Sequence, residues 1–136
     1  MSEAKRQALK NYLESDEDPE YMWGSDTEFE CESEEWLVCT DEEADELTAA
    51  YIKDTLWAFR PGFLVGYIDA HLPESHLSKI QSEMCEDANE VILALVRDNL
   101  DDLISDAVSA DGRGHFLSGY DGEEVEMGDF YAYRRN

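Results

Sequence analysis

Apolar residues near the N-terminus follow first a helical period and then a strand period. Residues 3–14 predict a short helix whose buried face carries Ala4, Ala8 and Tyr12, with Leu9 beside them. Residues 27–31 alternate apolar and acidic side chains, which is typical of a strand with one buried face and one acidic face. Residues 36–40 form a short apolar run that predicts a second strand.

A helix is predicted to follow the second strand. Thr40 and Glu43 have the spacing of a capping box, in which each residue's side chain satisfies the backbone N–H of the other. The helix or its continuation is expected to run to about Phe59, because Pro61 and Gly62 break it. Its inward face is predicted to carry four residues at helical spacing: Ala44, Leu47, Tyr51 and Thr55.

Two further helices are predicted in the second half of the chain. Residues 74–97 show the clearest helical stripe, made of Leu77, Ile80, Met84, Ala88, Val91 and Leu95. Another helix begins near Asn99 and is expected to end at Asp111-Gly112, since glycine often follows the last helical residue.

The C-terminal residues predict a β-hairpin. Residues 124–127 and 130–134 flank Gly128-Asp129, and glycine in the first loop position suits a type II′ turn. The expected fold class is therefore α+β, with three or four helices packed on a small antiparallel sheet built from both ends of the chain. A single domain over residues 1–136 is expected, and the acidic segment 15–35 is expected to be partly flexible.

The charge of the chain restricts its possible partners. It has 34 acids and 10 bases, a net charge of -24, and no Lys or Arg lies between Asn11 and Ile52. Direct binding to nucleic acid or to an anionic membrane requires a basic surface, so neither is expected. The expected partner is a basic nucleic-acid-binding protein. With neither a secretory signal nor an apolar run of membrane-spanning length, a cytoplasmic location is expected.

The amount of charge is comparable with that of DNA. Duplex DNA carries one negative charge per ~1.7 Å of axis, so 24 charges correspond to about 40 Å of duplex. A compact chain of 136 residues has a radius of gyration of ~14 Å, so its full extent is similar to that length of duplex. The chain therefore carries about as much charge as a piece of DNA of its own length.

The predicted partner-binding surface combines three groups of acids with two aromatic anchors. The acids are Glu28, Glu30, Glu32, Glu34 and Glu35 in the strand region, Glu42, Asp45 and Glu46 in the following helix, and Glu83, Glu86, Asp87 and Glu90 in the 74–97 helix. Acids at every second strand position would form a row with intervals of about 6.6–6.8 Å. Trp23 and Phe29 are expected to add apolar contact at the centre of the patch.

Ordinary structural explanations compete for two of these groups. Acids in the first turns of a helix are favoured by its dipole, which accounts for residues 42–46. The acids of residues 83–90 also fit a solvated helix face. The alternating acids of residues 28–32 have no such explanation, so they are the strongest candidates for function.

An enzymatic or metal-binding function is not expected from the candidate residues. His71 and His76 are five positions apart, which is not the i, i+4 spacing of zinc ligands on a helix. His115 lies in a Gly-rich turn, and neither Cys39 nor Cys85 belongs to a nucleophile motif. No dedicated metal site or cofactor is predicted.

One stretch of the sequence resembles a known group of proteins. The run from Ser109 to Glu124, SADGRGHFLSGYDGEE, together with Leu56-Trp57-Ala58-Phe59 and residues 41–45, is similar to small acidic proteins encoded by bacteriophages. The resemblance covers about residues 36–136. It implies an accessory function in the bacterial host cytoplasm, and it brings no activity with it.

The resulting hypothesis is a non-enzymatic phage inhibitor. It would act as a DNA mimic that blocks a host defence protein, either a restriction complex or a CRISPR effector. Two alternatives stay open: an acidic module that binds a basic host protein without mimicry, and a salt-adapted domain of unrelated function. The stoichiometry is also open, and a homodimer would lengthen the charged track.

Overall fold

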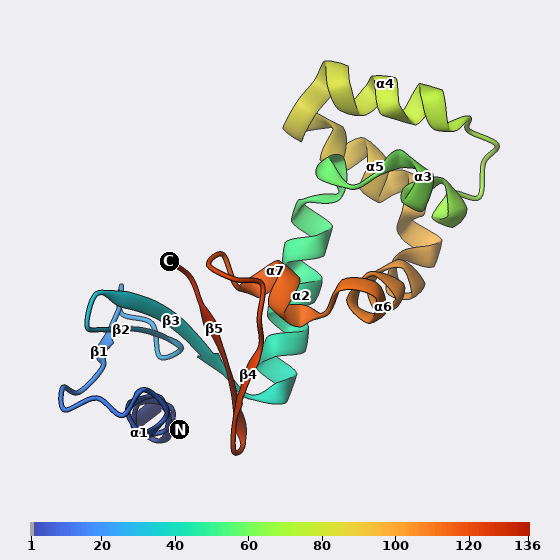
Figure 1. The fold of residues 1–136 in the computed structure, drawn as a ribbon. Coiled ribbons are helices and arrows are strands. Elements are labelled where there is room, and N and C mark those ends of the chain that lie inside the picture. The colour runs from blue at the N-terminus through green and yellow to red at the C-terminus, as the bar shows by residue number, and fades with distance from the viewer. Residues whose placement is uncertain (1) are drawn as a thin grey trace. The chain divides into compact units, whose positions relative to one another are not determined.

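The computed structural model describes residues 2–136, which divide into two compact units (Figure 1). The first unit contains residues 1–48 and 111–136, and the second contains residues 49–110. Helices and an antiparallel sheet make up the fold, so the predicted α+β class is confirmed. None of the helices in this described part is long and apolar enough to cross a membrane. The single domain over residues 1–136 stays a prediction.

The first unit is built on a five-stranded antiparallel sheet with the order β1-β2-β3-β5-β4. The strands are β1 (Glu20–Tyr21), β2 (Glu28–Cys31), β3 (Glu34–Cys39), β4 (Val125–Met127) and β5 (Phe130–Arg134). The long β3 pairs with β2 on one side and with C-terminal β5 on the other. Both ends of the chain therefore contribute to one sheet, as the sequence predicts.

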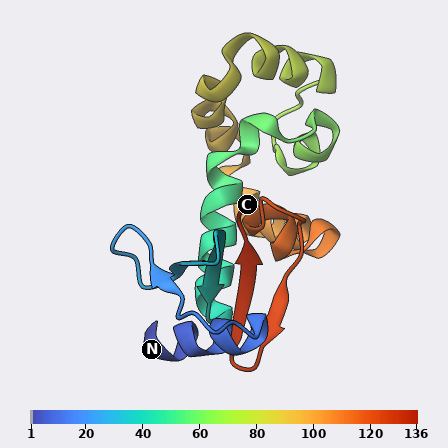
Figure 2. The ribbon, with the colours of Figure 1, turned by 60° about the vertical axis from the view of Figure 1, so that its left-hand side comes forward.

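Helices cover the two faces of this sheet (Figures 1 and 2). On one face, Leu9 of α1 (Ser2–Leu13) joins a core with Phe29, Trp36, Val38 and Ala132. On the other, Ala44 of α2 (Asp41–Asp54) and Leu117 of α7 (Arg113–Leu117) pack with Leu37, Cys39 and Tyr133. Each apolar face of the sheet thus has its own helical cover.

Two-residue turns connect β2 to β3 and β4 to β5, and they set where these strands end. Gly128 has φ +67° in the β4–β5 hairpin and Asp129 does not have positive φ, which agrees with the predicted type II′ turn. The β2–β3 turn has φ 51° at Glu32 and 71° at Ser33, the pattern of a type I′ turn. Strand β2 consequently ends at Cys31, and Glu32 lies in the turn.

The second unit is entirely helical in its regular structure. After the end of α2 come α3 (Pro61–Leu64), α4 (Glu74–Met84), α5 (Ala88–Val96) and α6 (Leu100–Asp111), with 3₁₀ turns η1 (Leu56–Ala58), η2 (Val65–Tyr67), η3 (Cys85–Asp87) and η4 (Arg97–Asn99) between them. Helix α2 ends at Asp54 rather than near Phe59, and the chain continues as η1.

The single helix predicted over residues 74–97 is wrong, because the chain turns at Cys85 with φ 52°. Helices α4 and α5 instead lie side by side (Figure 1). Gln81 donates hydrogen bonds to the carbonyls of Trp57 and Phe59, and Asn89 donates to that of Lys53. These bonds hold both helices against the same segment, which a straight helix could not achieve.

The buried faces of α1 and α2 also differ from the predicted ones. Helix α1 buries Lys5 and Leu9, whereas Tyr12 is exposed. Helix α2 buries Ala44, Thr48 and Ile52, whereas the predicted core residues Leu47 and Tyr51 are exposed. In both helices a polar residue takes a buried position, so a pattern based on apolar residues points to the wrong face.

Candidate acidic interaction surface

Three carboxylates lie side by side across strands β1, β2 and β3. Glu30 is the register partner of Glu20 on one side and of Glu35 on the other. Residues directly opposite in antiparallel strands have Cβ atoms about 4.5–5.5 Å apart. Glu20, Glu30 and Glu35 are called the acidic row below.

The acidic row lies on the face of the sheet that α2 and α7 cover elsewhere. Side chains alternate along a strand, so Glu35 shares its face with Leu37 and Cys39, which pack under those helices. Glu20 and Glu30 are exposed and Glu35 is half-buried. The row is therefore the uncovered end of an otherwise buried sheet face.

The side chains of the acidic row form no ion pair with a base of residues 2–136. They also take part in none of the side-chain hydrogen bonds formed by these residues. The backbone N–H of Arg135 donates to the Glu35 carbonyl at 2.7 Å, but no ion pair joins the two side chains. Like charges directly opposite each other destabilise a sheet, so this arrangement has a cost in stability.

The row runs across the strands, which differs from the predicted row along one strand. Glu28 shares a face with Glu30 and is opposite Leu37, but Glu32 lies in the hairpin turn. Glu34 belongs to the other face, where it accepts a hydrogen bond from the Trp36 indole at 3.1 Å and pairs with Arg134 at 3.8 Å. The predicted Glu28-Glu30-Glu32 row is thus wrong in its direction.

The two predicted aromatic anchors differ in their exposure to solvent. Phe29 is fully buried in the core beneath α1, so the prediction that it contacts a partner is wrong. Alternation already placed Phe29 on the buried side of its strand, and the interface role contradicted that pattern. Trp23 is 76% exposed in the β1–β2 connection.

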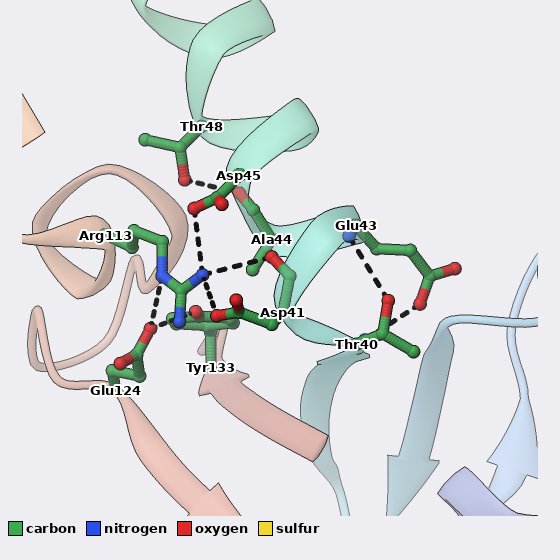
Figure 3. A network of polar contacts seen from close by, with 9 residues as sticks. All are labelled: Thr40, Asp41, Glu43, Ala44, Asp45, Thr48, Arg113, Glu124 and Tyr133. Atoms are coloured by element: carbon green, nitrogen blue, oxygen red, sulfur yellow. Dashed lines mark hydrogen bonds and ion pairs between the residues drawn. The ribbon is translucent and has the colours of Figure 1, made fainter. Parts of the chain in front are cut away.

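The first turns of α2 are occupied by an internal ion-pair network (Figure 3). Arg113 Nη1 lies 2.9 Å from Asp41 Oδ1 and 3.0 Å from Asp45 Oδ1, and Arg113 Nε donates to Glu124 at 2.8 Å. Asp45 is therefore engaged within the protein, whereas Glu42 and Glu46 are exposed and unpaired among the described residues.

Aromatic residues complete this network. The Arg113 guanidinium lies 4.7 Å from the centre of the Tyr131 ring, and the Tyr133 hydroxyl donates to Glu124 (Figure 3). Burial of Tyr133 and its bond to Glu124 raise the pKa of that hydroxyl. Burial opposes the charge of Arg113, but its hydrogen bonds to Glu124 and Asp41 outweigh burial and raise its pKa. The sole arginine of the Ser109–Glu124 run thus ties α7 to α2 and to the segment before β4.

A buried lysine was not anticipated from the sequence. Lys5 is fully buried in α1, and its Nζ lies 2.7 Å from Glu43 Oε1. It has no hydrogen bond with other described residues, so Glu43 alone balances its charge. Glu43 is the capping-box residue of α2, as predicted: the N–H of Thr40 donates to Glu43 Oε1 at 2.8 Å, and the N–H of Glu43 donates to Thr40 Oγ1 at 3.2 Å (Figure 3). The sequence did not indicate that Glu43 also pairs with Lys5.

The acids of residues 83–90 do not share one helical face. Glu83 is at the end of α4, Glu86 and Asp87 are in η3, and Glu90 is in the first turn of α5. The predicted ridge along a continuous helix is therefore wrong, although all four side chains are exposed.

The cysteine and histidine residues considered for catalysis differ in their burial. Cys39 is fully buried, and burial together with the nearby Glu43 carboxylate raises the pKa of its thiol to about 12. His71, His76 and His115 are exposed. Among residues 2–136, no group of three or more His, Cys, Asp or Glu side chains is placed to hold a metal ion.

Comparisons with known proteins assign no family to this chain. No family model, no curated protein and no solved structure matches it. The resemblance to phage-encoded proteins accordingly stays a prediction.

Proposed function

We propose that this chain is a non-enzymatic inhibitor whose carboxylates occupy the phosphate-binding track of a basic protein. The observation that carries the proposal is the acidic row, where Glu30 has a carboxylate directly opposite on both sides and forms no ion pair with a base of residues 2–136. A cationic groove would remove this repulsion on binding. The free chain thus holds in place a charge pattern that only a partner relieves.

The bases of the first unit support the proposal. Lys5, Arg6, Lys10, Arg113 and Arg134 each contact a carboxylate within the same unit. Their positive charges are therefore directed inward or balanced locally. A partner that approaches the acidic row meets carboxylates, with Arg135 as the nearby base.

The spacing of the carboxylates suits arginine and lysine side chains that normally bind phosphates. The Cβ atoms of cross-strand neighbours lie about 4.5–5.5 Å apart. Along β2, the backbone positions of Glu28 and Glu30 lie about 6.6–6.8 Å apart. A two-dimensional array of this kind offers bidentate sites to guanidinium groups, which recognise carboxylate and phosphate with the same fork geometry. Competition for such groups is the mechanism by which DNA would be excluded.

The target class follows from the predicted phage setting. A host defence protein that binds DNA, either a restriction complex or a CRISPR effector, has the basic groove that this surface requires. Association should be fast and strongly dependent on salt, because exposed charges steer the encounter and are screened within about 10 Å at 0.1 M salt.

The test uses the immobilised protein and a bacterial lysate, with elution by a salt gradient. The captured protein is purified, and its affinity is measured at low and high salt for wild type, Glu30→Lys and Glu126→Lys. Both variants change the net charge equally, but Glu126 lies in β4, away from the acidic row. Glu30→Lys should weaken binding much more than Glu126→Lys, and added DNA should displace the partner.

Three results would contradict the proposal. Equal losses for the two variants would mean that only net charge matters and that no carboxylate array is recognised. Binding that DNA cannot displace would favour an acidic interaction module without mimicry, and affinity insensitive to salt would exclude an electrostatic decoy.

A further inference from the structure

Trp23 stands at the tip of a structured turn and has no partner within the described chain. The turn spans Met22–Ser25, and the Ser25 N–H donates to the Met22 carbonyl at 2.8 Å. Trp23 has φ 50° and Gly24 has φ 67°, so this is a type I′ turn with tryptophan in its first central position. The indole is 76% exposed and makes no hydrogen bond or ring contact with residues 2–136.

The turn is well anchored at its base. The Met22 N–H donates to the Glu28 carbonyl at 2.9 Å, and the Thr27 carbonyl accepts from the Val38 N–H at 2.8 Å. Ser25 Oγ accepts from the Thr27 N–H at 3.1 Å and also contacts the Thr27 hydroxyl. Figure 2 shows this loop, coloured blue, projecting from the edge of the sheet. The backbone that carries the indole is thus fixed to β2 and β3.

Folding stability alone would select tryptophan neither for this exposed position nor for this left-handed backbone conformation. Left-handed backbone conformations disfavour bulky L-residues, and type I′ turns strongly prefer asparagine or aspartate followed by glycine. An exposed indole also gains nothing from the apolar core. A large planar ring is consequently held in solvent by a turn whose sequence preference lies elsewhere.

The same hairpin carries the acidic row. Strand β1 brings Glu20 opposite Glu30 and then leads, through Tyr21 and Met22, into the turn. The chain therefore presents carboxylates and an unstacked aromatic ring on one hydrogen-bonded hairpin. This combination of anionic groups and a free ring is the chemical pattern of a single-stranded nucleotide segment.

We propose that Trp23 takes the place of an unstacked base, so that the partner's groove is one that binds single-stranded or extruded nucleotides. The inference rests on the proposed decoy function and specifies its target. Proteins that bind single strands combine a basic track with aromatic or guanidinium platforms on which bases stack. A groove that contacts only the backbone of a duplex has no platform for the indole.

The experiment compares two competitors and two variants on the immobilised protein. The partner captured from a bacterial lysate is eluted with oligothymidylate or with duplex DNA at equal phosphate concentration. Its affinity is then measured for wild type, Trp23→Asn and Tyr120→Ala. Asparagine suits the turn, so Trp23→Asn removes the ring without disturbing the backbone. Tyr120 is a matched control because it is also an exposed aromatic residue of the first unit, but its ring lies against Arg134.

Oligothymidylate should elute the partner at a lower concentration than the duplex does. Trp23→Asn should weaken binding about 5- to 150-fold, as expected for the loss of one stacked base, and Tyr120→Ala should not. Equal elution by both nucleic acids, or unchanged affinity of Trp23→Asn, would overturn the inference. If Trp23→Asn binds normally while Glu30→Lys does not, the decoy function survives; if neither variant is impaired, or no partner is captured, both proposals fail.

Discussion

The two units of this protein carry their negative charge in different ways. The first unit has 23 acids and 6 bases, a net charge of −17, and the second has 11 acids and 4 bases, a net charge of −7. In the second unit, acids such as Glu74, Glu90 and Asp101 occupy the first turns of helices. The helix dipole favours carboxylates there.

In the first unit, the acidic row places three acids where the fold gains nothing from them. The acidic row opposes like charges across a sheet, while most bases of the unit are used in ion pairs that connect its elements. Charge that a helix dipole favours needs no functional explanation, but charge kept against its own repulsion does. The comparison therefore directs the search for function to the sheet.

The largest expected effect tests whether the bases of the first unit are structural. Glu43→Gln leaves the Lys5 ammonium buried without a counter-charge, and we expect it to lower the free energy of unfolding by about 3 kcal/mol. Lys5→Met replaces the ammonium with an apolar side chain of similar size and should be neutral or stabilising. Urea denaturation of both variants measures the difference. Equal losses would show that the pair itself, rather than the uncompensated charge, matters.

The same pair predicts a dependence on pH. Burial of Glu43 opposes its ionisation, but its ion pair with Lys5 and its hydrogen bond from Thr40 outweigh burial and hold the carboxyl pKa below its ordinary value of 4.5. The carboxylate therefore stabilises the fold fully above that value, and the contribution is lost as the pH falls through the lower, folded pKa. Denaturation midpoints of wild type should fall more steeply than those of Lys5→Met below pH 4.5. Parallel curves for the two proteins would contradict this assignment.

A glycine from each unit tests how tightly the two are built. A Cβ at Gly114 would lie 2.5 Å from the Gly122 carbonyl oxygen and 2.8 Å from the Glu124 nitrogen, both in the backbone. Gly114→Ala should lower the free energy of unfolding by about 2 kcal/mol, since the chain must move apart. Gly66→Ala, whose Cβ meets nothing within 4 Å, is the control. If thermal denaturation shows similar losses for both, close packing of the 114 and 122–124 segments is not the cause.

Substitutions in the β2–β3 turn of the first unit should stabilise the protein. Glu32 and Ser33 occupy the two positive-φ positions of a type I′ turn, for which Asn-Gly is the preferred sequence. The double variant Glu32→Asn, Ser33→Gly should raise the free energy of unfolding by about 1 kcal/mol. Chemical denaturation measures the gain, and a loss would mean that the Glu32 carboxylate has an unrecognised structural role.

The smallest effect compares the acids of the two units directly. Glu30→Gln removes like-charge repulsion from two neighbours and should stabilise the protein by about 0.5 kcal/mol at low salt, with a smaller gain at high salt. Glu90→Gln removes a favourable interaction with the α5 dipole and should destabilise it by about 0.5 kcal/mol. Effects of the same sign would remove the distinction between the units.

Local sequence signals predicted several elements of this fold correctly. The capping box at Thr40 and Glu43, the alternation of Phe29 and Cys31 with acids, and the glycine-led C-terminal hairpin each depend on residues close together in the chain. The α+β class and the concentration of acids before residue 53 follow from the same kind of information. Such features need no knowledge of what lies across the structure.

Pairing between distant segments decided the rest. Strand register brought Glu20, Glu30 and Glu35 together across the sheet, and the contact with Glu43 allowed Lys5 to be buried. Hydrogen bonds from Gln81 and Asn89 to residues 53–59 favoured a break at Cys85 over one long helix. A carboxylate, an ammonium or an amide can be buried only beside a suitable partner, so its place in the fold depends on which partner the tertiary structure brings to it. The sequence by itself therefore determined how much charge the protein carries, and only the tertiary structure decided which charges oppose one another.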